Sequence, residues 1–210
     1  MKKNCTEVVF VLDRSGSMCG LEKDTIGGFN SLINKQKKQD GEVLVSTVLF
    51  NDSSVVIHDR KPIDEVRLMT SKDYEVYGCT ALLDALGSSI RHIGNIHKYA
   101  RVEDVPEHTM FVIITDGIEN ASRYYSKERV KSMIEYEKEK YGWEFLFIAA
   151  NMDAIDTASQ YGIDKDHAVN YQCDSVGTRL NYEVLDEAIQ CICSGVPLSK
   201  SWKSKIEKRK

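Results

Sequence analysis

The stretch VVFVLDRSGSM, residues 8–18, decides the fold. Its first five residues are apolar without interruption and rich in β-branched side chains, which is typical of a strand buried on both faces of a sheet. An aspartate and a polar turn that contains glycine follow at once. A strand of this kind requires helices on both faces of its sheet, so the stretch predicts an α/β fold in which the polar turn stands at the carboxyl end of a central strand.

The rest of the chain alternates between the same two kinds of pattern. The runs 43–50 and 55–57 are joined by a polar turn and predict an antiparallel hairpin, and further buried strands are predicted at 110–115, 145–149 and 168–171. Apolar residues at three- and four-residue steps predict helices over residues 21–39, 80–100, 126–141, 154–161 and 176–192. This order predicts a doubly wound, mostly parallel sheet with one antiparallel edge strand and helices on both faces.

The length of 210 residues fits one domain, and 42% hydrophobic with 29% charged residues is an ordinary globular composition. We place the domain at residues 1–195 and treat residues 196–210 as a basic C-terminal tail, with six basic side chains against Glu207. Because the net charge is −4, the chain has no general attraction to nucleic acids or anionic membranes, and we expect neither as a partner.

The sequence shows no sorting signal. The apolar run near the start is too short for a signal peptide, and no stretch approaches the roughly 20 apolar residues of a membrane span. The six cysteines fall at irregular spacings without a second pair for zinc, which favours reduced thiols. We therefore expect a cytoplasmic protein.

Oxygen ligands follow the predicted buried elements at three places in the chain. Asp13, Ser15 and Ser17 come after the first strand, Thr80 stands at the start of the strongest helix, and Asp116 follows the strand at 110–115. Because ligands bind at the carboxyl ends of strands in such sheets, we expect these side chains to meet. Two carboxylates and three hydroxyls without a nearby histidine suit Mg²⁺, with Mn²⁺ or Ca²⁺ as alternatives.

Each fragment also has an ordinary structural interpretation. Asp13 with Ser15, or Thr80 alone, could cap a helix, and Asp116 with the glycine after it could form a simple turn. Only the combination at one edge of the sheet favours a metal. We expect Glu119 and Asn120 to lie in a solvated loop, and we interpret Cys19 and Cys79 as small buried side chains.

The combination Asp13-x-Ser15-x-Ser17, Thr80 and Asp116-Gly117 resembles the metal-ion-dependent adhesion site (MIDAS) of the von Willebrand factor type A (vWA) domain family. The order of predicted elements is similar to the doubly wound fold of that family over most of the chain. The resemblance implies that these five side chains hold a metal directly or through water, and that an acidic residue of a partner protein occupies its open position. It implies no catalysis.

Two other functions stay open at this stage. An aspartate after the first strand also resembles Mg²⁺-dependent phosphohydrolases of the haloacid dehalogenase type, but those enzymes have Asp-x-Asp where this chain has Ser15. A purely structural interaction domain, in which the metal only stabilises the fold, is the other alternative. We predict a single, cytoplasmic, bacterial-style vWA domain that binds another protein and is not an enzyme.

Overall fold

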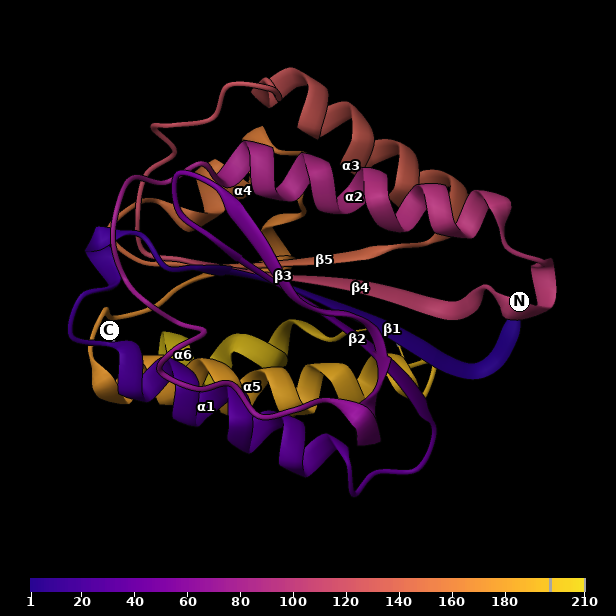
Figure 1. The fold of residues 1–210 in the computed structure, drawn as a ribbon. Helices are drawn as coiled ribbons and strands as arrows, with labels where there is room; N and C mark the ends of the chain where they lie inside the picture. The colour runs from indigo at the N-terminus through magenta and orange to yellow at the C-terminus, as the bar shows by residue number, and fades with distance from the viewer. Residues whose placement is uncertain (197, 210) are drawn as a thin grey trace.

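In the computed structural model of the protein, which describes residues 1–196 and 198–209, a six-stranded sheet lies between two layers of helices (Figure 1). The strand order is β3-β2-β1-β4-β5-β6. The sheet is parallel except for β3, which pairs antiparallel with β2 at one edge. The strands are β1 (Lys2–Asp13), β2 (Glu42–Phe50), β3 (Ser54–Pro62), β4 (Pro106–Thr115), β5 (Glu144–Ala149) and β6 (Ala168–Asn170).

The helices divide between the two faces of this sheet (Figure 1). One layer holds α1 (Glu22–Gln36), α5 (Ser175–Cys193) and the short α6 (Ser204–Glu207), and the other holds α2 (Leu82–Tyr99), α3 (Lys127–Tyr141) and α4 (Ala154–Gln160). Each layer buries its own apolar cluster against the sheet. The predicted α/β class, with its antiparallel edge strand and two helical layers, is confirmed.

Local sequence signals account for the ends of some helices. Ser126 caps α3, because its side chain accepts a hydrogen bond from the backbone N–H of Arg129 at 3.3 Å, and Gly142 ends that helix with a positive φ of 66°. The prediction for the start of α2 was wrong by two residues. That helix begins at Leu82 with Ala81 at the N-cap position, so Thr80 lies before the helix and does not cap it.

The C-terminal residues lie against the domain. Trp202 and Ile206 belong to the apolar cluster beneath α5 and are only 5% and 4% exposed. The ammonium group of Lys203 donates to the carbonyl oxygens of Lys165 and Ala168, each at 2.8 Å. Arg209 forms two hydrogen bonds with Asp174, at the N-terminus of α5. In the described part of the chain, this basic segment is therefore packed on the core.

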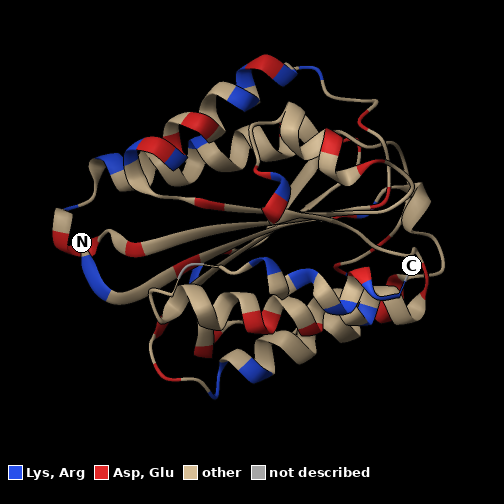
Figure 2. Ribbon diagram, turned by 180° about the vertical axis from the view of Figure 1, so that it is seen from behind, with Lys and Arg blue, Asp and Glu red and all other residues tan. Residues whose placement is uncertain are grey.

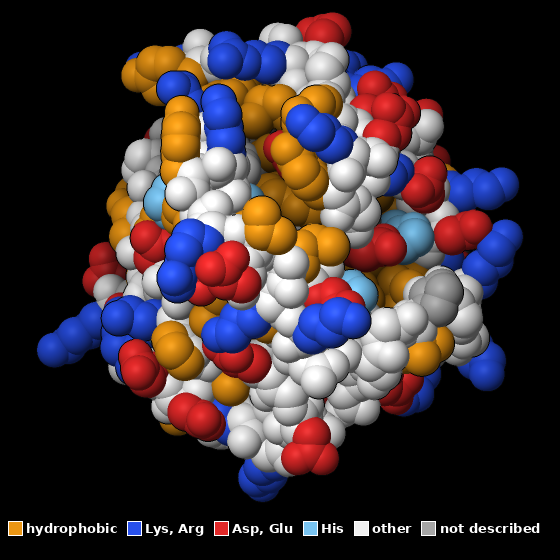
Figure 3. All heavy atoms as spheres, turned by 90° about the vertical axis from the view of Figure 1, so that its right-hand side faces the viewer, with side chains coloured by type: hydrophobic (Ala, Val, Ile, Leu, Met, Phe, Trp, Pro, Cys, Tyr) orange, Lys and Arg blue, Asp and Glu red, His pale blue; other side chains and the backbone are white. Residues whose placement is uncertain are grey.

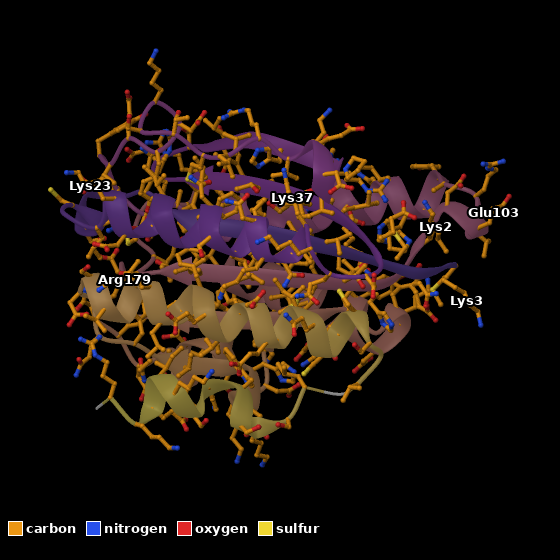
Figure 4. All side chains as sticks on the ribbon, turned by 90° about the horizontal axis from the view of Figure 1, so that it is seen from below. Lys2, Lys3, Lys23, Lys37, Glu103 and Arg179 are labelled. Atoms are coloured by element: carbon orange, nitrogen blue, oxygen red, sulfur yellow. The ribbon has the colours of Figure 1, made fainter. Side chains whose placement is uncertain are left out.

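The surface carries both signs of charge. Lysines and arginines alternate with acidic residues along the helices, while the central strands are mostly uncharged (Figure 2). Seen from the side of α1 and α5, Lys23 and Arg179 lie at one end of the molecule and Lys2, Lys3 and Glu103 at the other (Figure 4). No helix in the described ranges is both long and apolar enough to cross a membrane.

Candidate functional site

The predicted oxygen ligands meet where β1 and β4 end side by side. These two strands are parallel neighbours, with Leu12 opposite Ile114, so the residues that follow them leave the sheet at the same edge. From this point the chain passes to α1 on one face after β1 and to α3 on the other face after β4. This is the position at which the winding of the sheet reverses, where open α/β sheets bind their ligands.

Asp13 is buried, with 1% of its surface exposed. Its Oδ1 accepts a hydrogen bond from the backbone N–H of Ser15 at 2.7 Å, and its Oδ2 accepts one from the hydroxyl of Thr115 at 2.6 Å. Burial raises the pKa of the Asp13 carboxyl, although these hydrogen bonds lower it in part. The negative charge of Asp116 raises the pKa of Asp13 slightly further.

The two serines connect Asp13 with Asp116. The Oγ atoms of Ser15 and Ser17 lie 3.0 Å apart, and the Ser17 hydroxyl donates to Oδ1 of Asp116 at 2.5 Å. Ser15 and Asp116 are each only 1% exposed, whereas Ser17 lies at the exposed rim. The serine side chains cap no helix, because neither the 3-10 turn after Ser15 nor α1 receives a side-chain cap bond.

Thr80 joins the same group from the loop before α2. A Cβ atom placed on Gly117 would lie 2.7 Å from Oγ1 of Thr80, 3.1 Å from Oγ of Ser17 and 3.5 Å from Oγ of Ser15. All three hydroxyls therefore surround one small space beside Gly117. A side chain at this position would fill the space, so glycine leaves room for a ligand there.

The Thr80 loop is held by backbone contacts with three other segments. The N–H of Gly16 donates to the carbonyl of Gly78 at 3.0 Å, and the N–H of Ala81 donates to the carbonyl of Asn51 at 2.8 Å. Asn120 pairs with Thr80 in both directions, since its Oδ1 accepts from the Thr80 N–H at 2.9 Å and its own N–H donates to the Thr80 carbonyl at 3.0 Å.

Glu119 and Asn120 lie in the loop after β4, as expected, with Asn120 exposed and Glu119 half-buried, but both side chains also form hydrogen bonds with the segment before or at the start of α2. Glu119 accepts hydrogen bonds from the backbone N–H groups of Leu83, Ala121 and Ser122, and from the hydroxyl of Ser122, at 2.8–3.0 Å. These contacts tie the loop after β4 to the start of α2. In the sequence, only the position of Glu119 and Asn120 just after Asp116 indicated that they could hold this loop in place.

Besides Thr115, three further residues around the site were not found from the sequence. The hydroxyl of the buried Tyr74 donates to the carbonyl of Asp13, and the side chain of Asn151 donates to the carbonyl of Asp116 at 3.2 Å. The Cys173 thiol donates to Oδ2 of Asp116 at 3.4 Å, and burial together with that carboxylate raises the pKa of Cys173 to about 11. All three contacts depend on the tertiary approach of distant segments.

The remaining cysteines near the site differ from the expectation. Cys19 and Cys79 were interpreted as small buried side chains, but both are exposed. Met18, just before Cys19, and Thr80, just after Cys79, are buried. The adjacent cysteine side chains are directed to the surface. The sequence pattern around them gave no means of distinguishing these two orientations.

The donor set fits a hard divalent cation. Within the described residues, neither Asp13 nor Asp116 forms an ion pair, and the guanidinium of the neighbouring Arg14 lies over the ring of Tyr77 at 5.4 Å. Two carboxylates buried together without a cation are costly. The described residues contain no cluster of three or more His, Cys, Asp or Glu side chains that could hold a metal, and the set at this place consists of two carboxylates and three hydroxyls.

Comparison with known proteins identifies the fold. No family model matches the chain, and no curated protein matches its sequence. The vWF domain of the type V pili tip protein Mfa5 from Porphyromonas gingivalis, in contrast, superposes on it with a TM-score of 0.66, covering 92% of this chain and 97% of that domain at 11% identity. The chain shares the fold of von Willebrand factor type A domains.

Two further vWA-type structures extend this comparison. The ArnB paralog VWA2 from Sulfolobus acidocaldarius has a TM-score of 0.56 at 17% identity, covering 88% of this chain and 45% of that protein. Proximal thread matrix protein 1 from the mussel byssus, solved with a zinc-occupied MIDAS motif, has a TM-score of 0.60 at 15% identity over 90% of this chain and 47% of that one. The chain thus spans less than half the length of both proteins.

Proposed function

We propose that the chain is a metal-dependent protein-interaction module of the vWA type, and that Asp13, Ser15, Ser17, Thr80 and Asp116 form a MIDAS for Mg²⁺. A bound cation would supply a Lewis-acidic position that accepts a carboxylate oxygen from an Asp or Glu of the partner protein. The proposal includes no enzymatic activity. One observation carries it: three hydroxyls and two buried carboxylates from three separate segments converge beside Gly117.

The residues of this site would have different roles in binding a metal and a partner. Asp13 is fixed by the Ser15 N–H and the Thr115 hydroxyl, so its carboxylate is already oriented before a ligand binds. Neutral hydroxyls complete the set without adding negative charge, which leaves a bound dication able to attract an external carboxylate. Ser17 at the exposed rim marks the side from which a partner can approach.

Calorimetric titration of the metal-stripped chain with Mg²⁺ and Mn²⁺ tests the metal site. We expect binding in the wild type and its loss in Asp13→Ala and Ser15→Ala. Asp64→Asn is the matched control, because this exposed aspartate follows β3 at the opposite edge of the sheet. Equal behaviour of all four proteins, with no ion bound at millimolar concentration, would refute the metal site.

A second experiment separates an interaction site from a metal that only stabilises the fold. Thr80→Ala removes one hydroxyl and leaves both carboxylates in place. If the metal mediates binding, immobilised wild type captures its partner protein, the capture is lost with a chelator, and Thr80→Ala remains folded but captures nothing. If the metal is only structural, Thr80→Ala captures the partner as well as the wild type does.

A further inference from the structure

A second concave site lies at the opposite end of the molecule. A pocket of about 350 Å³ opens between α2, α3 and the start of β4. Its walls are largely apolar and include Val102, Val105, Pro106 and Trp143. Figure 3 shows this end of the molecule, where apolar side chains surround a hollow in the upper part, on the side of α2 and α3.

A buried carboxylate belongs to this pocket. Glu137 on α3 is only 9% exposed, and its Oε2 is buried without a hydrogen-bond partner. Among the described residues it forms no ion pair. An ionised group in this position loses its hydration without replacement, which costs free energy unless a cation reaches it.

None of the described cations near Glu137 forms an ion pair or a hydrogen bond with its carboxylate. Lys140 donates to the hydroxyl of Tyr136 at 2.6 Å, and the ammonium of Lys98 lies 5.3 Å from the ring centre of Tyr99. His97 lines the pocket, but its Nε2 is hydrogen-bonded to Glu7 at 2.6 Å. The charges of His97 and Lys140 act on the Glu137 carboxylate without contacting it, and a cation from outside the chain can supply the missing contact.

The surroundings of Gly94 show that the Glu137 carboxylate and the Trp143 indole lie on the same wall of the pocket. A Cβ atom on this α2 residue would lie 3.2 Å from Oε1 of Glu137 and 3.9 Å from Cη2 of Trp143. A ligand group that reaches the carboxylate therefore also meets the edge of the indole. The size of the pocket lies at the small end of the range for ligand sites, which suits one side chain or a small amine.

We propose that this pocket binds an organic cation, a primary ammonium group on an apolar stem, with the ammonium at Glu137 and the stem against Trp143, Val102 and Val105. A charge-assisted hydrogen bond and burial of the stem would both contribute to binding. The cation can be a free alkylamine or the lysine side chain of another protein, since both carry the same chemistry. This inference does not depend on the metal site.

Nuclear magnetic resonance of the ¹⁵N-labelled chain tests the proposal. The probes are n-butylammonium for a free amine, Nα-acetyl-lysine amide for a side chain in a peptide, and n-butanol as the uncharged analogue. We expect a saturable shift of the Trp143 indole resonance with at least one cation and a much weaker effect of butanol. The indole of Trp202, which is buried in the opposite layer, is the internal control and should not move.

Glu137→Gln and Glu139→Gln form the matched pair of variants. Both remove one negative charge from α3, but Glu139 is exposed. Loss of the charge-assisted bond in Glu137→Gln should weaken cation binding about tenfold or more, whereas Glu139→Gln should bind as the wild type does. Binding of only one cation supports the proposal and identifies the source. No saturable shift with either cation, or equal binding by Glu137→Gln, overturns it.

Discussion

Gly117 is the residue on which the shape of the candidate metal site depends most directly. Its φ is not positive, so alanine is tolerated by the backbone, but the added Cβ would stand 2.7 Å from Oγ1 of Thr80 and 3.1 Å from Oγ of Ser17. We predict that Gly117→Ala weakens Mg²⁺ binding about 10- to 100-fold, the usual effect of disturbing the surroundings of metal ligands. Calorimetric titration measures this directly.

Gly27 provides the control for this substitution. It lies inside α1, and a Cβ there would meet nothing within 4 Å. Alanine in a helix interior is more favourable than glycine by about 0.5–1 kcal/mol, so Gly27→Ala should raise the free energy of unfolding and leave Mg²⁺ affinity unchanged. If Gly117→Ala binds Mg²⁺ as tightly as Gly27→Ala, the space beside Gly117 is not the cation site.

Glu137 makes the stability of the unliganded protein depend on pH. Burial raises the pKa of Glu137 above its ordinary value of 4.5, while His97 and Lys140 lower it in part. The folded state therefore holds the proton more tightly than the unfolded state does, and stability falls as pH rises from 4.5 through the folded-state pKa. We predict that Glu137→Gln is more stable than the wild type at neutral pH and loses this advantage below pH 4.5.

Chemical denaturation of both proteins across this pH range checks the prediction. Glu139→Gln, which changes an exposed carboxyl on the same helix, should show no comparable trend. A stability difference between Glu137→Gln and the wild type that stays constant with pH would mean that the carboxyl does not titrate differently in the folded state. A saturating organic cation should abolish the disadvantage of the wild type, because it replaces the lost hydration of the carboxylate.

At the scale of elements, the loop after β4 fixes the segment before α2. Asn120 forms hydrogen bonds with both backbone groups of Thr80, and it is not one of the proposed ligands. We predict that Asn120→Ala weakens Mg²⁺ binding about tenfold, because it removes the side-chain acceptor of the Thr80 N–H and leaves only the backbone bond to the Thr80 carbonyl. Asn95→Ala, on the exposed side of α2, is the control and should leave the affinity unchanged. Unaltered binding by Asn120→Ala would show that Thr80 is positioned without it.

The same loop shows where prediction from the sequence ends. Continuous apolar runs and helical spacing located the strands and helices, because burial against the sheet acts on each segment locally. The contact between Asn120 and Thr80 joins residues 40 positions apart. On Thr80 it uses main-chain atoms, which every residue type has, so the sequence cannot indicate it. Thr115 and Cys173 were missed for the same reason, since each acts on a carboxylate that only the completed sheet brings near.

At the scale of the molecule, the sheet order explains why scattered motifs predicted one site. Ser17 and Asp116 are separated by 99 positions, yet parallel pairing of β1 and β4 brings their side chains within a hydrogen bond. The direction of the strands alone makes their carboxyl ends neighbours, so motif order and strand prediction together were sufficient. The pocket at Glu137 had no such signal, because its walls come from α2, α3 and β4 and contain no recurrent motif.

The C-terminal segment carries the last prediction. Its charge suggested a tail, although Trp202 and Ile206 stand four residues apart and form one apolar side of a helical turn. Trp202 is 5% exposed, and its indole N–H donates to the carbonyl of Asp166 at 2.8 Å. We predict that Trp202→Ala lowers the free energy of unfolding by about 3–5 kcal/mol, as for other buried tryptophans.

Lys200→Ala, which removes only an exposed charge from the same segment, should have little effect in the same denaturant titration. Equal stability of the two variants would mean that residues 199–209 are a detachable tail in solution, and that the domain ends before them.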